Sequence, residues 1–157
     1  MKQLFNFRTI MMIVFAIAFL SLTNCTKTDD RDQFVGQYSL NATGSYSMTI
    51  NGETYTYPIS DKNKTLIIEK SSSSDNMVFV TGYYNAEALV TGNSIEIDSE
   101  TSTQTQDGVT ITLTVNHNRG TLTGSSLSFT SSLIGNAYYQ GYSYPIYGNV
   151  SNIAYKK

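Results

Sequence analysis

The strongest constraint on the fold of this chain is an alternation of apolar and polar residues with a period of two. The clearest example is 109–115, where four apolar residues alternate with three threonines. Successive side chains of a β-strand point to opposite faces of a sheet, so this run predicts a strand with one buried face and one wet face. Its β-branched residues also favour a pleated strand. No apolar series of helical spacing and length occurs after residue 33, so the sequence predicts an all-β domain.

Other segments repeat this pattern less regularly and are separated by turn signals. Asn51-Gly52 is the strongest signal, because a tight hairpin turn needs positive φ at both central residues, and Asp107-Gly108 is another. Many short strands with turns between them predict an antiparallel barrel or sandwich of about 8–10 strands, spanning residues 34–157. The predicted strands besides 109–115 are 34–42, 45–50, 53–59, 65–70, 77–83, 86–90, 94–98, 121–123, 127–133 and 150–155.

The apolar positions of these strands define the expected core. Ile111 belongs to it, so we expect Ile111→Asp to destabilise the fold far more than Thr112→Asp. The expected core residues are Phe34, Tyr38, Leu66, Ile68, Val78, Val80, Ala88, Val90, Ile95, Ile97, Ile111, Leu113, Val115, Leu122, Leu127 and Phe129.

Residues 1–24 have the layout of a signal peptide, which would begin as a helix. A cationic start is followed by the apolar run 10–20, which is short of the roughly 20 residues that a spanning helix needs. The chain's single cysteine, Cys25, ends the sequence Leu22-Thr23-Asn24-Cys25, which resembles the lipobox of bacterial lipoproteins. The resemblance implies a diacylglycerol on the Cys25 thiol, cleavage before Cys25, and acylation (for example palmitate) of the new amino group. The alternatives are an ordinary signal peptide followed by a free thiol, and an uncleaved anchor helix.

Residues 25–33 carry the lipidation site and then only polar or charged side chains, so we expect a flexible acidic tether. Asp29-Asp30 resembles the short acidic export signals of surface lipoproteins in Bacteroidota; the alternative is a solvated linker. The expected location is the outer membrane, held by the lipid, on its periplasmic face or at the cell surface.

Short motifs in the domain resemble small lipocalin-like lipoproteins of Bacteroidota. Residues 34–38, Phe-Val-Gly-Gln-Tyr, resemble the opening strand of that family, with Tyr38 in the place of tryptophan. Residues 88–97 and 120–129 resemble its hairpins. The resemblance implies a lipocalin-like barrel, in a group whose members mostly lack an assigned activity.

Charge and cysteine usage exclude several classes of function. Ten basic and twelve acidic residues give a net charge of -2, and removal of Lys2 and Arg8 with the leader would leave eight basic residues and a net charge of -4. This acidity argues against nucleic acid as a partner and against electrostatic binding to anionic lipids. A single cysteine cannot form an intrachain disulfide, so packing must hold the fold.

No motif predicts catalysis, a metal site or a cofactor, and we expect a protein that is not an enzyme. The only histidine, His117, lies in a run expected to form an exposed turn, without the other His or thiolate ligands that zinc or copper would need. Glu96, Asp98 and Glu100 offer carboxylates, but we expect them to be outward residues of one strand.

Tyrosine is the one residue type in excess. Five of the twelve tyrosines lie in 138–147, a stretch with Gly and Pro that we expect to form a loop or an irregular edge. They allow a surface that stacks on glycans, or tyrosines that pack one end of a barrel. The candidate ligand-binding residues are Tyr138, Tyr139, Tyr142, Tyr144 and Tyr147.

Three classes of function stay open from the sequence, and an enzyme, which would need a cleft with converging polar groups, ranks below the other two. The first is a lipid-anchored envelope module that binds a small apolar ligand or a glycan without catalysing a reaction. The second is a structural or accessory subunit of an outer-membrane or surface assembly.

Overall fold

The computed structural model describes residues 28–157. The expected signal peptide, the lipobox with Cys25 and the first part of the expected tether lie outside the described residues.

The described chain is almost entirely β-structure, which confirms the predicted class. A short 3-10 helix, η1 (Asp30–Gln33), precedes ten strands, and every strand pairing is antiparallel. The strands are β1 (Gly36–Ile50), β2 (Glu53–Lys70), β3 (Met77–Gly82), β4 (Ala86–Thr91), β5 (Ser94–Ile97), β6 (Glu100–Gln106), β7 (Val109–His117), β8 (Gly120–Thr123), β9 (Ser126–Tyr139) and β10 (Tyr142–Lys156).

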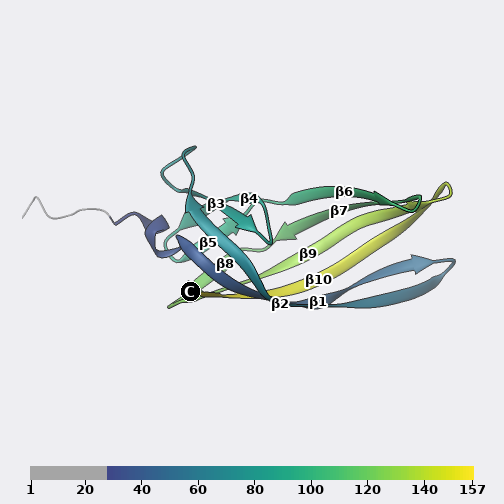
Figure 1. The fold of residues 1–157 in the computed structure, drawn as a ribbon, viewed down its shortest axis with the longest axis horizontal. Helices are drawn as coiled ribbons and strands as arrows, with labels where there is room; N and C mark the ends of the chain where they lie inside the picture. The colour runs from purple at the N-terminus through teal and green to yellow at the C-terminus, as the bar shows by residue number, and fades with distance from the viewer. Residues whose placement is uncertain (1–27) are drawn as a thin grey trace, which may run out of the picture.

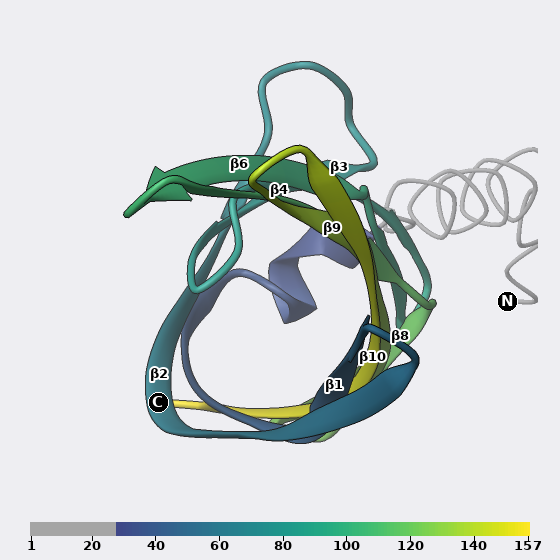
Figure 2. The ribbon, with the colours of Figure 1, turned by 90° about the vertical axis from the view of Figure 1, so that its right-hand side faces the viewer.

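The sheet closes on itself over part of its length. Its strand order is β10-β1-β2-β3-β4-β5-β8-β9-β7-β6, and β9 also pairs with β10, so eight strands form a ring (Figure 2). Strand β9 pairs with β8 over 126–128 and with β7 over 131–139. Because β8 occupies only the first part of this edge of β9, the ring is closed at one end of the molecule.

We call the ring the closed end and the remainder the open end. At the open end the long strands continue past the ring in the order β6-β7-β9-β10-β1-β2 (Figure 1). Among the strands of residues 28–157, β6 pairs only with β7, and β2 pairs with β3 only over Leu66–Lys70. The open end is therefore a curved sheet with two free edges, β6 and the first part of β2.

Three tight turns form the tips of the open end. Asn51-Gly52 and Asp107-Gly108 both have positive φ, 50° and 84° in the first and 50° and 77° in the second, as the predicted hairpins require. Gln140-Gly141 forms a third turn of this kind, with φ of 49° and 85°. The stretch around it is a regular hairpin of β9 and β10, so the expectation of a loop or irregular edge at 138–147 is wrong.

The main core lies inside the closed end. Leu66, Ile68 and Ile95 are completely buried there, as expected, and Phe34 closes the cluster from the N-terminal side. Ile111 is not a core residue, because its side chain is 41 % exposed, and Leu113 and Val115 are only half-buried. Strand β7 lies at the open end, where no second layer of residues 28–157 covers its apolar face, so the expected core assignment of Ile111 is wrong.

Several strand boundaries also differ from the sequence prediction. Strands β1 and β2 are each continuous where the sequence predicted two strands, and a bulge at the Leu40/Ala42 register shift accommodates Asn63 at a positive φ of 55°. Strand β6 was not predicted, because its sequence Glu-Thr-Ser-Thr-Gln-Thr-Gln contains no apolar residue.

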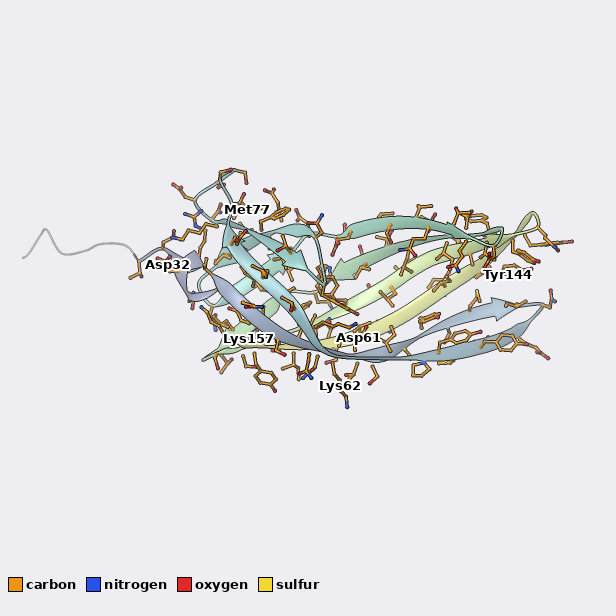
Figure 3. All side chains as sticks on the ribbon, in the orientation of Figure 1. Asp32, Asp61, Lys62, Met77, Tyr144 and Lys157 are labelled. Atoms are coloured by element: carbon orange, nitrogen blue, oxygen red, sulfur yellow. The ribbon has the colours of Figure 1, made fainter. Side chains whose placement is uncertain are left out.

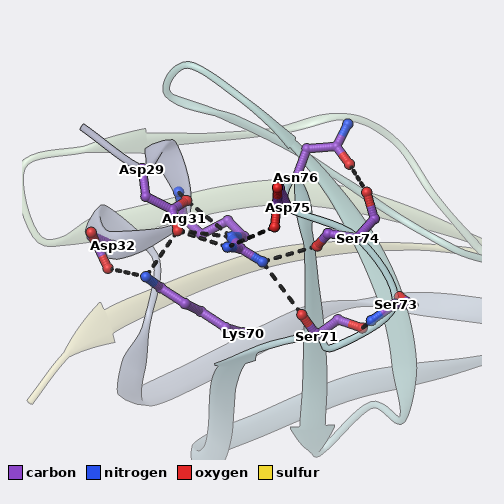
Figure 4. Close-up of polar contacts among 9 residues, drawn as sticks. All are labelled: Asp29, Arg31, Asp32, Lys70, Ser71, Ser73, Ser74, Asp75 and Asn76. Carbon is purple, nitrogen blue, oxygen red and sulfur yellow. Dashed lines mark hydrogen bonds and ion pairs between the residues drawn. The ribbon is translucent and has the colours of Figure 1, made fainter. Parts of the chain in front are cut away.

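Residues 29–33, expected within a flexible tether, fold onto the closed end (Figure 4). The Arg31 guanidinium bonds Asp29 and donates to the carbonyl oxygens of Ser71 and Ser74 at 3.3 and 2.9 Å. Lys70 Nζ lies 2.9 Å from Asp29 and 2.6 Å from Asp32. These bonds to Arg31 and Lys70 hold the pKa of Asp29 well below its usual range. The charged side chains of this segment, which suggested a solvated tether, instead bind Lys70 of β2 and the carbonyl oxygens of the β2–β3 loop.

Phe34 then enters the ring behind η1. Its side chain is fully buried, and its carbonyl oxygen accepts a hydrogen bond of 2.7 Å from the Tyr38 hydroxyl. Figure 2 shows η1 lying across the far opening of the ring, so this end of the interior is capped.

Candidate functional site

The candidate site is the concave inner face of the open end, which we call the groove. Its floor is apolar, with side chains from β1, β7, β9 and β10 brought together by the strand register. A pocket of about 230 Å³ lies along it. The lining residues are Tyr46, Ile111, Leu113, Leu133 and Ile146.

A second pocket, of about 400 Å³, lies where the groove meets the closed end, and we call it the basal pocket. It shares Tyr46, Leu113 and Leu133 with the groove pocket, so the two are continuous. Its other walls mix apolar side chains with two carboxylates and two phenols. These residues are Ile59, Val115 and Val150, with Asp61, Tyr83, Tyr84, Glu100, Thr101 and Ser102.

Three glycines allow the sheet to curve around the groove. A Cβ at Gly148 would lie 2.6 Å from the Ser45 carbonyl oxygen, and Cβ atoms at Gly44 and Gly135 would collide with backbone oxygens of the neighbouring strands. None of the three has a positive φ, so the requirement is for space and not for an unusual conformation. Glycines inside strands mark close backbone approach and sharp bends.

Asp61 and Tyr83 form one polar wall of the basal pocket. The Tyr83 hydroxyl donates to Asp61 Oδ2 at 2.7 Å, and Lys64 Nζ lies 3.4 Å from Asp61 Oδ1. The bond from Tyr83 lowers the pKa of Asp61, so this carboxylate stays charged at neutral pH. Burial, together with the bond to Asp61, raises the pKa of Tyr83. Figure 3 places Asp61 where the β1–β2 hairpin leaves the closed end.

A buried chain of polar side chains runs behind the pocket. The Tyr84 hydroxyl donates to Asn152 Oδ1 at 2.9 Å, and Asn152 Nδ2 donates to Ser131 Oγ at 3.0 Å. Ser131 Oγ lies 2.8 Å from His117 Nδ1. When the Ser131 hydroxyl donates to Nδ1, the proton of the neutral imidazole is on Nε2, on the side of Glu100. Burial raises the pKa of Tyr84 to about 12.

His117 is buried, so its predicted place in an exposed turn is wrong. It ends β7, its side chain is 0 % exposed, and its ring packs edge-on against Tyr84 with centroids 4.5 Å apart. Phe129 lies against the same ring at 5.8 Å. This burial lowers the pKa of His117, although the nearby Glu100 opposes the shift.

Glu100 faces inward, contrary to the prediction of an outward carboxylate. It lies opposite Val115 on the β6–β7 ribbon and lines the basal pocket. Its Oε1 atom is 3.6 Å from His117 Nε2, and both atoms are buried without a hydrogen-bond partner. Glu96 is exposed as expected, with Arg119 3.4 Å away.

Glu100, His117 and Ser131 follow the order of a carboxylate, base and hydroxyl in hydrolases, but the geometry does not favour that chemistry. Ser131 is 2 % exposed, and its oxygen already accepts from Asn152. A nucleophile must reach its substrate, so Ser131 has the geometry of a structural link.

The five candidate tyrosines divide between the two faces of the β9–β10 hairpin. Tyr142 pairs with Tyr139, and Tyr144 pairs with the buried Ala137, so these three tyrosines belong to the inner face. Tyr147 pairs with Ile134 on the outer face, which Tyr138 shares. Tyr144 lies near the tip of the open end (Figure 3), and the five do not form one platform.

Nothing in the sequence indicated Ile59 and Ile146 as site residues, whereas Tyr46, on the Asn-Gly hairpin, was open to the same two interpretations as the tyrosines of 138–147. The sequence signal for Tyr46 was its place in an alternating strand, and its ring stacks on Tyr57 with centroids 5.1 Å apart. The remaining two carried no signal beyond their apolar character.

Within residues 28–157 no three His, Cys, Asp or Glu side chains are grouped so that they could hold a metal ion. The same part of the chain contains no helix with the length and apolar character needed to cross a membrane. Comparison of the chain with known protein families, with curated proteins and with solved structures found no match in any of the three.

Proposed function

We propose that this protein is a lipid-anchored binding module of the bacterial cell envelope that holds a small apolar ligand in the groove. The observation that carries the proposal is the uncovered apolar floor of the open end. Ile111 is 41 % exposed there, beside the half-buried Leu113, on a surface that is concave and continuous with the basal pocket. Ligand sites are typically concave and apolar with a few polar groups, and the groove has this composition.

The ring-like closure supports a lipocalin-like architecture as part of the same proposal. One end of the interior is capped by η1 and filled by the main core, and the other end opens into the groove. A ligand would therefore enter from the open end.

The proposed anchor fits the position of the described N-terminus. Thr28 lies three residues beyond Cys25, a span of at most about 11 Å at 3.3–3.6 Å per residue. If Cys25 carries the lipid, the closed end lies next to the outer membrane and the tips of the open end point away from it (Figure 1). The ligand would then reach the groove from the aqueous side.

Two exposed isoleucines on adjacent strands allow a matched test of the groove. Ile111 lies on the inner face of β7 and Ile134 on the outer face of β9, and they are 41 % and 49 % exposed. The neutral dye N-phenyl-1-naphthylamine is titrated into the purified protein and its fluorescence is recorded. We expect Ile111→Asp to weaken binding about tenfold or more, because a charge replaces apolar contact, and Ile134→Asp to leave it unchanged. Equal effects of the two changes, or no dye binding by the wild type, would overturn the proposed groove.

The anchor is tested separately in cells. Wild-type protein should incorporate labelled palmitate and fractionate with the outer membrane, and Cys25→Ser should lose both properties. An unlabelled wild-type protein would contradict the lipidation.

A role as an accessory subunit is the second candidate, favoured by the free edge of β6. Residues 101–106 belong to an edge strand that pairs with β7 on one side, and they lack the charge or proline that usually protects such edges. Ile134, Tyr138 and Tyr147 add exposed apolar area on the outer face. This reading predicts that Thr103→Pro and Ile134→Asp disturb the cellular role while Ile111→Asp does not.

A further inference from the structure

We propose that the ligand of the groove is a cationic amphiphile, whose ammonium head binds between Glu100 and Asp61 in the basal pocket and whose apolar tail lies along the groove. This inference rests on the proposed function and adds the chemical class of the ligand.

The two carboxylates come from opposite free edges of the open end. Glu100 lies on β6 and Asp61 on β2, opposite Ala42 of β1, and both line the basal pocket. No Lys or Arg is among the described residues that line this pocket. The polar end of the cavity is therefore acidic, and the charge complement of an acidic pocket is a cation.

Glu100 lacks a cationic partner in the described part of the chain. Its Oε2 atom accepts from the Asn85 backbone N–H at 3.0 Å, but Oε1 is buried and has no hydrogen-bond partner. No Lys or Arg nitrogen of residues 28–157 lies within 4.0 Å of it. A buried carboxylate oxygen without a partner is unfavourable. The Glu100 side chain as a whole is 25 % exposed, so a rotation that turns Oε1 towards the pocket would let an ammonium group donate to it and relieve that cost.

His117 does not supply the missing charge. Its Nε2 atom lies 3.6 Å from Glu100 Oε1, beyond a good hydrogen bond, and has no other partner. Its ring is enclosed by Tyr84 and Phe129, and Ser131 contacts the other nitrogen. Burial lowers the pKa of His117, so the imidazole stays neutral near pH 7. The positive charge must come from outside residues 28–157.

Asp61 provides the second contact. The bond from Tyr83 keeps it charged, and its only cationic neighbour in the described residues is the half-exposed Lys64. An ammonium group between β6 and β2 would have one carboxylate on each side, which a sulfate or carboxylate head would not tolerate.

The groove has the length of a medium alkyl chain. From Val115 to Ile111 the strand advances four residues, or about 13 Å at the rise of an extended strand. Val115 lines the basal pocket, and the side chains of the groove pocket beyond it are apolar apart from the Tyr46 hydroxyl. Tyr139 and Tyr144 continue the inner face towards the tip.

The test compares three ligands with the same tail. Decylamine, decanol and decyl sulfate each displace N-phenyl-1-naphthylamine from the full-length protein at pH 7, below the concentrations at which they form micelles. We expect decylamine to bind about tenfold or more tightly than decanol, and decyl sulfate to bind most weakly.

Glu100→Gln should remove the preference for the amine, and Asp61→Asn should reduce it. Glu96→Gln is the matched control, since Glu96 is an exposed carboxylate on β5 away from the basal pocket, and it should change nothing. Both pocket variants are checked for cooperative unfolding in urea, and a preference lost in either folded variant supports the inference.

Two results would overturn the inference at different levels. If the three ligands compete equally, or decyl sulfate binds best, the proposed preference for a cationic head is wrong, while the proposed binding of an apolar tail in the groove is retained. If neither the dye nor any ligand binds, the proposed function fails together with it.

Discussion

The closed and open ends are parts of one sheet with similar alternating strands, yet the apolar inner face is buried at the closed end and partly exposed at the open end. At the closed end Ile68 and Ile95 are completely buried inside the ring. At the open end Ile111 lies on the equivalent inner face and is 41 % exposed. The difference is coverage: β3, β4, β5 and β8 complete a ring over one part of the long strands and leave the other part as an open trough. Alternation therefore identifies an apolar face, and topology decides whether that face becomes a core or a binding surface.

The largest expected effect is the loss of stability when a buried isoleucine of the closed end, rather than an exposed one of the open end, is shortened. Ile68→Ala removes buried methylene groups from the ring and should cost about 2–5 kcal/mol of unfolding free energy, as large-to-small core changes do. Ile111→Ala removes the same atoms from an open surface and should cost about 1 kcal/mol or less. Urea denaturation of both variants measures the difference. Equal losses would mean that the open end is covered in solution.

The next largest effect is the loss of stability when alanine replaces a glycine of the groove. Gly148→Ala places a Cβ 2.6 Å from the Ser45 carbonyl oxygen, so the strands must separate, and we expect a loss of about 1–3 kcal/mol. Gly141→Ala, in a turn where a Cβ meets nothing within 4 Å, should cost about 1 kcal/mol through its φ of 85° alone. Gly148→Ala should also weaken dye binding in the groove. A variant that is less stable but binds the dye normally would show that the curvature at Gly148 is not needed for binding.

The free energy of unfolding should depend on pH through His117, which lies at the boundary between the two ends. Burial holds the folded-state pKa of His117 below the ordinary imidazole value of about 6.5, so the folded protein binds fewer protons than the unfolded chain. The stability that His117 contributes is present above about pH 6.5 and is lost as the pH falls towards the folded pKa. The unfolding free energy of wild type relative to His117→Gln should therefore decrease between pH 7 and pH 5. A relative stability that rises on acidification would show that the buried imidazole is charged.

The smallest effect concerns the outer face of the open end. Threonine hydroxyls pair across β6 and β7, with Oγ1 atoms of Thr103 and Thr112 3.0 Å apart. Thr103→Ala should cost about 0.2–1 kcal/mol, the range of single cross-strand pairs. Dye binding should stay unchanged, because these hydroxyls face away from the groove. A larger loss of stability would mean that the β6–β7 ribbon packs against more than its hairpin partner.

The sequence was sufficient for those features that depend on local chemistry. The turns at Asn51-Gly52 and Asp107-Gly108, and the buried positions of the ring strands, followed from backbone preference and alternation. The exposure of Ile111 and the burial of His117 did not, because both depend on which strands lie opposite them in space. Strand β6 was missed because an edge strand at the rim of a groove needs no apolar side chain.

The candidate site was predictable only in part. The sequence marked tyrosines near the tip, but it could not show that they divide between two faces of one hairpin. It placed Glu100 outward, since one carboxylate after another in 96–100 suggests a solvated strand. The turn between β5 and β6 instead directs Glu100 inward, 3.6 Å from a histidine seventeen residues later in the chain.

The docking of η1 has a mechanical consequence. Arg31 is bound to the β2–β3 loop through Ser71 and Ser74, and Asp30 and Gln33 are both bound to Gly92 in the β4–β5 turn. A pull on the chain at residue 28 is thus distributed over two loops before it reaches the start of β1. If the proposed anchor holds the chain at its N-terminus, a force on the folded domain would act on these two loops before it could separate β1 from the sheet.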